Sequence, residues 1–248
     1  MLLLGVDEAG RGPVLGPLVV AAFKMPQHDL HHLRWAGVQD SKQLSKSRRE
    51  ELYEWLHEEG SQRGWAIEIE VSAASRVDRA MQVATLNVHE VELFAAVVNR
   101  IAASQEQLQQ GVIQLDACDS NAERFGNDVA ARLKNWPWNS WEVDSRHKAD
   151  QIHLAVAAAS IAAKVRRDSA MLDLSTSLGI DLGSGYPSDP VTQAALPQLL
   201  NDSEPADCVR WRWKTVERLW KEIHGTKVPL RAVSRDCQAS GQQTLDLF

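Results

Sequence analysis

Residues 5–22, GVDEAGRGPVLGPLVVAA, place two adjacent carboxylates, Asp7 and Glu8, at the end of an apolar run. A connection rich in glycine and proline follows, and a second apolar run, PLVVAAF, begins at residue 17. Because so short a connection has no room for a crossover helix, the two runs are predicted to be antiparallel neighbours in a sheet. Two negative charges at the end of a buried strand also require a partner that neutralises them.

Strand and helix patterns alternate along the first 178 residues. The segment WAIEIEVSA at 65–73 alternates apolar and polar residues, as a half-buried strand does. Ser47 and Glu50 have the spacing of a capping box and predict that a helix begins there. Further helices are predicted at about 77–103, 122–134 and 150–168, and further strands at 2–6, 17–23, 111–117 and 141–145. The pattern predicts an α/β fold with a central mixed β-sheet flanked by helices.

The composition changes beyond residue 178. The segment 178–190 holds three glycines and two prolines and predicts a loop. The segment 208–225 predicts an amphipathic helix with a stripe of tryptophans toward the core, and the polar residues after it predict a flexible tail. The chain is therefore expected to divide into a main domain at 1–178, a small C-terminal helical segment at 179–225 and a tail at 226–248.

Composition also limits the class of protein. The chain of 248 residues has three cysteines, none in a CxxC pair, which is typical of reduced thiols in a cytoplasmic protein. No apolar run approaches the length of a membrane span, so no membrane contact is expected. The net charge of −6 argues against indiscriminate nucleic-acid binding but allows a local basic groove. A monomer is expected.

Acidic residues stand at the ends of three predicted strands. Asp7 and Glu8 follow the first strand, Asp116 follows GVIQL, and Asp150 precedes the alanine-rich helix. Loops converge at strand ends in such sheets, so neighbouring strands could bring the four carboxylates together. Carboxylates held close must share protons or bind cations, and all-oxygen ligands suit Mg²⁺ or Mn²⁺. The sequence gives no strand order, however, and for Asp150 a helix cap is an equally good interpretation.

Five motifs, in order between residues 2 and 220, resemble those of type 2 ribonuclease H (ribonuclease HII) in its archaeal and eukaryotic branch. They are GVDEAGRGPVLGPLVVAA at 5–22, DSKQLS at 40–45, LDACDSNAERFG at 115–126, HKADQIHLAVAAASIAAKVRRD at 147–168 and GSGYPSDP at 183–190. The resemblance implies an RNase H-like fold and an endonuclease that hydrolyses the RNA strand of RNA–DNA hybrids. It also implies cutting 5′ of ribonucleotides embedded in duplex DNA, which leaves 3′-hydroxyl and 5′-phosphate ends.

The resemblance assigns roles to the acids. It implies that Asp7, Glu8, Asp116 and Asp150 are the catalytic residues and the ligands of two Mg²⁺ or Mn²⁺ ions, which would clamp the attacking water and the leaving oxygen. Asp119 also belongs to the DACD motif, and we interpret it as a helix cap rather than a ligand.

The resemblance also assigns contacts with the substrate. It implies that the backbone of Gly10, Arg11 and Gly12 holds the ribonucleotide and that Tyr186 packs on its sugar at the RNA-to-DNA junction. Glycine suits such a loop because it lets the backbone approach a sugar and phosphate closely. Phosphate contacts are implied for Ser41, Lys42 and Lys164.

Two features lie outside these motifs. Arg210, Lys214 and Lys221 fall along one side of the helix predicted at 208–225, which is equally consistent with a duplex-facing surface and a solubilising face. The last seven residues, QQTLDLF, resemble the motif by which replication proteins dock on sliding clamps, with Gln242, Leu245 and Phe248 at its key positions. A PCNA-like clamp is therefore an expected partner, beside hybrid and ribonucleotide-containing duplexes.

Two other functions stay open from the sequence. A DNA-cleaving recombination nuclease of the same superfamily would keep the four acids without needing Tyr186 or the Gly-Arg-Gly loop. A non-catalytic hybrid-binding adaptor tethered to a clamp would keep the basic groove and the tail, but it would not need four intact acids.

Overall fold

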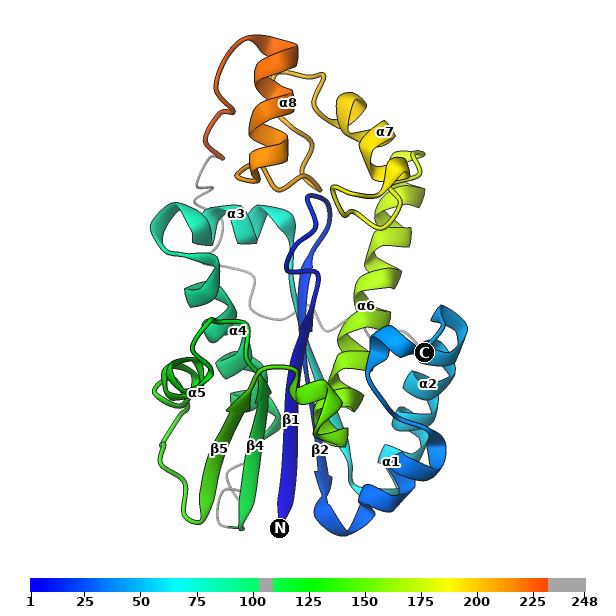
Figure 1. Cartoon of the computed structure of the whole chain (residues 1–248), viewed down its shortest axis with the longest axis vertical. Coiled ribbons are helices and arrows are strands. Elements are labelled where there is room, and N and C mark those ends of the chain that lie inside the picture. Colours follow the sequence, from blue (N-terminus) through cyan, green and yellow to red (C-terminus); the bar gives the residue numbers. More distant parts are fainter. Residues whose placement is uncertain (103–108, 232–248) are drawn as a thin grey trace.

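The computed structural model describes residues 1–102 and 109–231, which form a five-stranded sheet with helices on both faces (Figure 1). The strands are β1 (Leu2–Ala9), β2 (Leu18–Pro26), β3 (Ala66–Ser72), β4 (Gly111–Asp116) and β5 (Trp141–Arg146). Their order is β3-β2-β1-β4-β5, with antiparallel pairs β1–β2 and β2–β3 and parallel pairs β1–β4 and β4–β5. The predicted mixed sheet and its antiparallel first pair are confirmed.

The described residues form eight α-helices, most of which cover the two faces of the sheet, whereas the last two belong to the C-terminal segment. They are α1 (Leu30–Ala36), α2 (Lys46–Arg63), α3 (Ala74–Val83), α4 (Leu86–Ile101), α5 (Ala122–Ala130), α6 (Leu154–Leu178), α7 (Pro190–Leu199) and α8 (Lys214–His224). Leu4 and Val6 of β1 pack in one core with α4 and α5, and Leu3 packs in another with α1, α2 and α6. Because side chains alternate along a strand, Asp7 points to the α6 side of the sheet and Glu8 to the α4 side.

The helix α6 lies unusually close to β1. A Cβ atom at Gly5 would stand 2.2 Å from the carbonyl carbon of Ala155, so only glycine fits at this crossing. The facing turns of α6 are alanines, all fully buried, which allows the same approach from the helix side. The close packing carries Ser160 and Lys164 of α6 past the end of β1 that bears Asp7.

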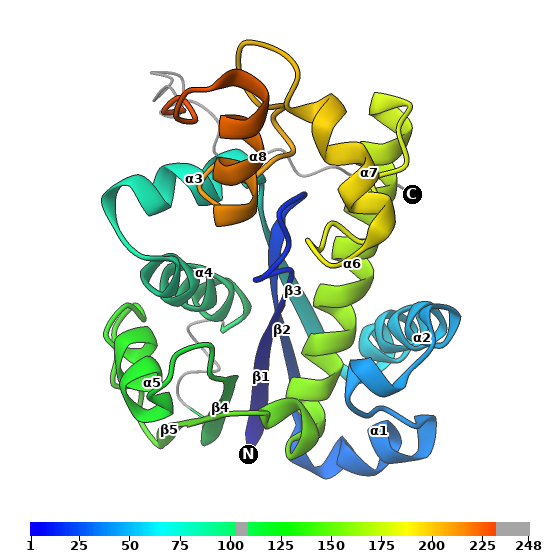
Figure 2. The ribbon, with the colours of Figure 1, turned by 45° about the horizontal axis from the view of Figure 1, so that its top comes forward.

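The C-terminal segment packs against the far end of α6 and against the loop between β1 and β2. Val14 and Leu15 of that loop share a core with Met171 of α6 and with Val216 and Trp220 of α8. In Figure 2 this loop lies between α8 and the loop that precedes α7. The segment therefore supports the residues that follow the two acids of β1.

Several predicted boundaries are wrong. The helix predicted at 77–103 is two helices, because Thr85 accepts a hydrogen bond from Val88 N and caps the start of α4. The cap of α2 is Ser45, which accepts from Arg48 N, and not Ser47. The first strand extends to Ala9, so both of its acids lie inside β1 rather than beyond it. The helices α1 and α7 were not predicted.

The helix predicted at 150–168 is shifted as well. The helix α6 begins at Leu154 and continues to Leu178, with His153 as its N-cap residue. Asp150 lies in the preceding 3₁₀ turn, Ala149–Gln151, and its side chain caps neither element. The helix-cap interpretation of Asp150 is therefore wrong. Likewise α5 ends at Ala130, four residues before the predicted end at 134.

The end of the chain is described only in part. Residues 232–248, which include Gln242, Leu245 and Phe248, lie outside the described residues. The start of the predicted tail is packed as far as Arg231, whose Nε donates to Asp78 at 3.0 Å. Within 1–102 and 109–231, no helix has both the length and the apolar character needed to cross a membrane.

Candidate active site

Three carboxylates meet at the end of β1 and β4. Asp7 comes from β1, Asp116 is the last residue of β4, and Asp150 comes from the turn before α6. One carboxylate oxygen of each lies within 4.8 Å of the others. Asp116 Oδ1 also accepts a hydrogen bond from Ala149 N at 2.9 Å, which fixes the turn that carries Asp150. Strand order, which the sequence could not give, thus brings three of the four predicted acids together.

The environment of this acidic trio disfavours negative charge. Burial, and next the charges of Glu8 and Asp116, hold the pKa of Asp7 well above its usual range. Burial likewise raises the pKa of Asp116, and burial together with the charge of Asp116 raises that of Asp150. Carboxylates in such surroundings gain from a proton or a cation.

Asp150 shows the clearest need for a ligand. Both of its carboxylate oxygens are buried, and neither accepts a hydrogen bond from the described residues. Lys42 Nζ lies 3.8 Å from one of them, too far for a hydrogen bond. Buried oxygens that protein donors leave free are what an oxygen-binding divalent cation would use.

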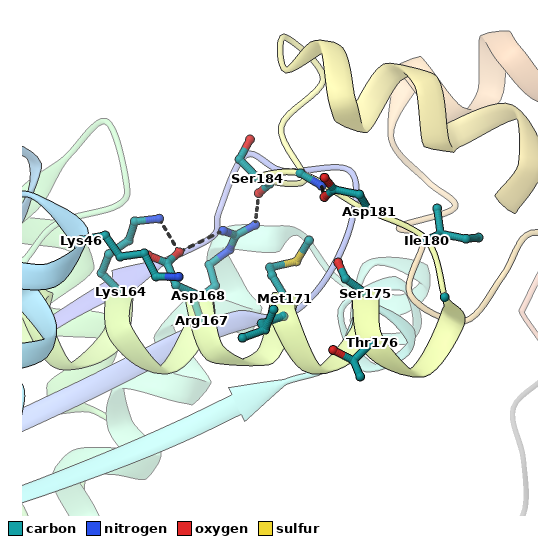
Figure 3. Close-up of a pocket in the computed structure, with 13 residues that line it drawn as sticks. Lys46, Lys164, Arg167, Asp168, Met171, Ser175, Thr176, Ile180, Asp181 and Ser184 are labelled. Carbon is teal, nitrogen blue, oxygen red and sulfur yellow. Dashed lines mark hydrogen bonds and ion pairs between the residues drawn. The ribbon is translucent and has the colours of Figure 1, made fainter.

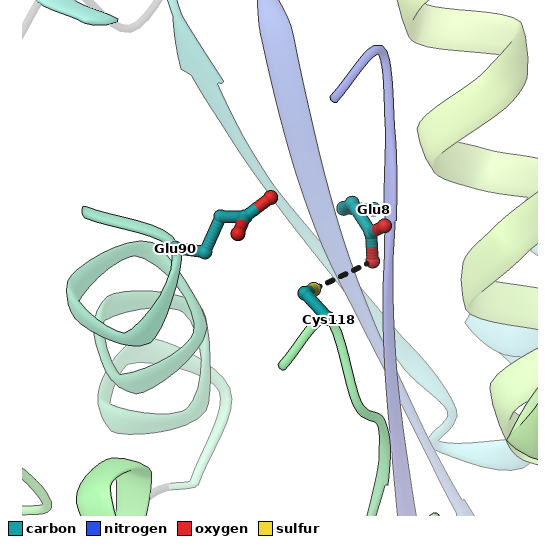
Figure 4. Close-up of side chains that lie close together, drawn as sticks. All are labelled: Glu8, Glu90 and Cys118. Atoms are coloured by element: carbon teal, nitrogen blue, oxygen red, sulfur yellow. Dashed lines mark hydrogen bonds between the residues drawn. The ribbon is translucent and has the colours of Figure 1, made fainter. Parts of the chain in front are cut away.

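Glu8 lies on the other face of β1, as strand alternation requires. Its carboxylate accepts a hydrogen bond from Cys118 Sγ at 3.2 Å and faces Glu90 of α4 (Figure 4). Burial, and next the charge of Glu8, raises the pKa of Glu90 to about 8. Glu8 lines the same cavity as Asp7, so the fourth acid borders the trio without joining it.

One cavity of about 220 Å³ gathers most of the predicted site residues. Its lining includes three of the acids, part of the glycine loop, the predicted phosphate contacts and the tyrosine: Asp7, Glu8, Asp116, Gly10, Arg11, Ser41, Lys42, Lys164 and Tyr186. Gly12 lies beside it, since a Cβ atom there would stand 3.5 Å from the Tyr186 ring. Ser160 and Arg49, which the sequence did not single out, also line it.

The loop after β1 is held by its carbonyl groups. Arg210 is fully buried and donates to the carbonyl oxygens of Gly10 at 2.5 Å, Arg11 at 3.0 Å and Gly16 at 3.0 Å. The indole Nε1 of Trp213 donates to the Gly12 carbonyl at 3.1 Å. The duplex-facing interpretation of Arg210 is therefore wrong, because this side chain supports the loop from inside.

Tyr186 lies in a loop that Arg167 holds in place. Its side of the loop before α7 is fixed by Arg167, whose Nη2 donates to Ser184 O at 2.9 Å. The Arg167 guanidinium also lies 5.6 Å from the centre of the Tyr186 ring. Tyr186 is 39% exposed, so the ring keeps a face open to a ligand. A tyrosine held in this way can present that face to a sugar without moving.

The predicted phosphate contacts lie along the cavity with partners of their own. Ser41 Oγ lies 2.9 Å from Ser160 Oγ, and Lys164 Nζ donates to Asp168 at 2.7 Å. Burial lowers the pKa of Lys42, but the charges of Asp150 and Asp7 raise it, and the net result is a raised pKa. Lys164 also lines a second, open cavity of about 670 Å³ between α6 and the loop before α7 (Figure 3).

Asp119 does not belong to the trio, because its carboxylate binds donors from its own loop and from α5. It accepts hydrogen bonds from Asn121 N and Ser120 Oγ, each at 3.1 Å, and from Arg124. These donors, led by the Asn121 amide, hold the pKa of Asp119 below its usual range. The cap of α5 is Asn121 rather than Asp119, although Asp119 does stabilise the turn before that helix.

Comparison with known proteins agrees with this geometry. The family model of ribonuclease HII matches residues 4–216. Ribonuclease HII of Methanococcus maripaludis strain C6 is 38% identical over 228 residues, covering 92% of this chain and 90% of that one.

Solved structures give the same result. Ribonuclease H2 of Pyrococcus horikoshii OT3 superposes with a TM-score of 0.77 at 32% identity, covering 91% of this chain and 100% of the other. A PCNA:RNase HII complex from Archaeoglobus fulgidus gives a TM-score of 0.73 at 34% identity, covering 86% of this chain and 96% of that chain. The predicted resemblance and its RNase H-like fold are confirmed. The chain belongs to the ribonuclease HII family, and it is an endonuclease that cleaves RNA in RNA–DNA hybrids.

Proposed function

We propose that this enzyme incises duplex DNA on the 5′ side of an embedded ribonucleotide, in addition to cleaving longer hybrids. The observation that carries the proposal is that one cavity is lined by three of the four acids, by Gly10 and Arg11 of the loop after β1 and by Tyr186. The acids would bind the metal ions that catalyse hydrolysis, whereas the loop and the tyrosine ring supply groups that can contact a sugar. Recognition of the 2′-hydroxyl is what distinguishes a ribonucleotide from its neighbours in DNA.

The residues of the trio fit Mg²⁺ or Mn²⁺, because they offer only oxygen and because both Asp150 oxygens are buried without donors. Asp7, Asp116 and Asp150 would hold the cation, and Glu8 would complete a two-metal site at the cavity edge. Bound divalent cations supply an activated water and charge stabilisation for the departing oxygen.

The chain's own groups orient the substrate. The loop offers backbone amides beside the acids, and Tyr186 offers an exposed ring face beside Gly12. Lys42 and Lys164 border the cavity and would attract the phosphates without reading sequence. The open cavity between α6 and the loop before α7 continues this path with Lys46, so it would accept the strand beyond the cut.

The decisive experiment uses a labelled DNA duplex with one ribonucleotide and an all-DNA duplex of the same sequence. Each is incubated with Mg²⁺, with Mn²⁺ or with EDTA, and the products are sized. A metal-dependent cut 5′ to the ribonucleotide, absent from the all-DNA duplex, is expected. Cutting of both duplexes would favour a DNA nuclease, and cutting of a long hybrid alone would contradict the ribonucleotide-in-DNA activity.

We also propose that the C-terminal residues Gln242, Leu245 and Phe248 bind a sliding clamp. Support comes from the motif itself and from the relative that has been solved in complex with PCNA. Clamp binding through these residues would tether the nuclease to replicating DNA without altering its active site.

A further inference from the structure

The side chain of Arg11 lies against α4. Its Nε donates to both oxygens of Glu90, at 2.8 and 3.1 Å, and its Nη2 donates to Asn87 Oδ1 at 2.7 Å. Asn87 and Glu90 are three residues apart on α4, so one face of the helix presents both acceptors. Two of the three guanidinium nitrogens are therefore bound within the protein.

Glu90 is an unusual residue for this position. It is fully buried, on a helix whose other buried side chains are apolar except for His89, and it lies beside Glu8 (Figure 4). A buried carboxyl group near a second one is costly unless it keeps a proton or a cation holds it. Arg11 Nε donates to both Glu90 oxygens, so this contact fixes the position of the loop after β1 relative to α4.

The backbone of the same loop is fixed from the opposite direction. Arg210 draws the carbonyl oxygens of Gly10 and Arg11 toward the C-terminal segment. In a planar trans peptide the N–H points opposite to the carbonyl, so the amides of Arg11 and Gly12 must point away from Arg210. Among the described residues, neither amide donates a hydrogen bond.

Asn87 also contacts the loop that follows β4. Its Nδ2 donates to Asp119 Oδ2 at 3.1 Å, while its Oδ1 accepts from Arg11. Asp119 follows β4 by three residues, so Asn87 connects the loop after Asp7 with the loop after Asp116. The first turn of α4 thereby sets the spacing between the loops that follow β1 and β4, the strands that carry Asp7, Glu8 and Asp116.

We propose that Asn87 and Glu90 are positioning residues for cleavage: they hold the Arg11 side chain against α4 so that the loop presents its amides, and not a guanidinium, to the ribonucleotide. The inference rests on the proposed incision at embedded ribonucleotides. It assigns to α4, which bears none of the predicted catalytic acids, a role in placing the substrate.

The first test asks whether Arg11 binds phosphate. Duplex affinity is measured without divalent metal over a range of salt concentrations, for the wild type and for Arg11→Met. The wild-type slope of log affinity against log salt is expected in the variant. A slope shallower by about 0.9, the value for one lost phosphate contact, would overturn the proposal.

The second test asks whether α4 positions the loop. Asn87→Ala and Glu90→Gln are expected to lower kcat on a single ribonucleotide by between about tenfold and about a hundredfold, as small misplacements do, with KM changed less than about threefold. Asn99→Ala is the matched control, because Asn99 also bridges two groups from α4, namely Arg132 O and Lys134 N, away from the site. It should lower Tm without changing kcat.

The outcomes distinguish a failure of the positioning role from a failure of the proposed incision at embedded ribonucleotides. A wild type that fails to cut at a single ribonucleotide contradicts the proposed function, and the same variants are then compared on a long hybrid. A wild type that cuts, with Asn87→Ala folded and equal to it in kcat, overturns the positioning role. Asn87 is only partly buried, so this variant keeps the test decisive even if Glu90→Gln unfolds.

Discussion

Replacing Arg210 with methionine tests whether the loop after β1 is supported from inside the protein. The substitution keeps an unbranched side chain of similar length but removes three donors to backbone carbonyl oxygens. Each hydrogen bond from a charged donor contributes about 1.5–3 kcal/mol, so the three together contribute about 4.5–9 kcal/mol. The variant no longer buries a charged guanidinium, and avoiding that desolvation stabilises the folded state by several kcal/mol.

The net expectation is a loss of about 3 kcal/mol in the free energy of unfolding, near the lower end for breaking a buried charged contact. In a chain of this size each kcal/mol lowers Tm by about 2–4 °C, so Tm should fall by about 6–12 °C. Cleavage should fall too, because the freed carbonyl groups let the loop amides turn away from the cavity.

The assay is thermal and urea unfolding of Arg210→Met beside Lys214→Met. Lys214 is the matched control, since it begins α8, belongs to the same predicted basic stripe and is exposed. Lys214→Met should unfold like the wild type. The reasoning is refuted if Arg210→Met keeps the wild-type Tm and instead loses duplex affinity with a shallower salt dependence, as a surface phosphate contact would.

Four further results are expected. Asp116→Asn should abolish Mg²⁺-dependent cleavage while duplex affinity stays within about threefold, measured by gel shift in EDTA; full activity would exclude Asp116 from the site. Tyr186→Ala should slow cutting at a single ribonucleotide more than at a long hybrid, at unchanged Tm; an unfolded variant would indicate a packing role. Deleting 242–248 should remove affinity for a PCNA-like clamp, measured by calorimetry, and leave cleavage of free substrate unaltered; retained affinity would refute the docking motif. In EDTA the free energy of unfolding should fall as the pH rises from about 5 to about 8, because carboxyl groups with raised pKa keep protons in the folded state that the unfolded chain has released. Glu90, with a pKa of about 8, is one of these groups. Mg²⁺ should reduce this fall, and a stability that does not change with pH in EDTA would contradict the directions of the pKa shifts.

The sequence predicted the sheet better than it predicted the helices. Alternation and short connections are local signals, so the strands and the antiparallel first pair could be read directly. The break between α3 and α4 depends on a single cap at Thr85, which apolar periodicity hides. The start of α8 depends on contacts across 200 and 201 positions of the chain, because Arg210 and Trp213 bind the loop after β1 instead of continuing a helix.

The site was predictable to a similar degree. Acids at strand ends pointed to one edge of the sheet, and the resemblance supplied which acids to choose. Glu90 and Asn87 gave no signal, since a polar residue on a predicted amphipathic helix reads as a solvated one. Their role depends on which helix lies over which strand, and no local pattern contains that information.

The adjacent acids of β1 have a geometric explanation in the pleat of the strand. Consecutive side chains point to opposite faces, so Asp7 reaches the α6 side and meets Asp150, whereas Glu8 reaches the α4 side and meets Cys118. A single strand end thereby supplies carboxylates to both faces of one sheet edge. Any insertion of one residue between Val6 and Asp7 would exchange the two faces, and the trio would lose its member from β1 while every side chain was still present. The order Asp-Glu at this strand end is therefore fixed by which helix covers which face, and not by the acidity of the two residues alone.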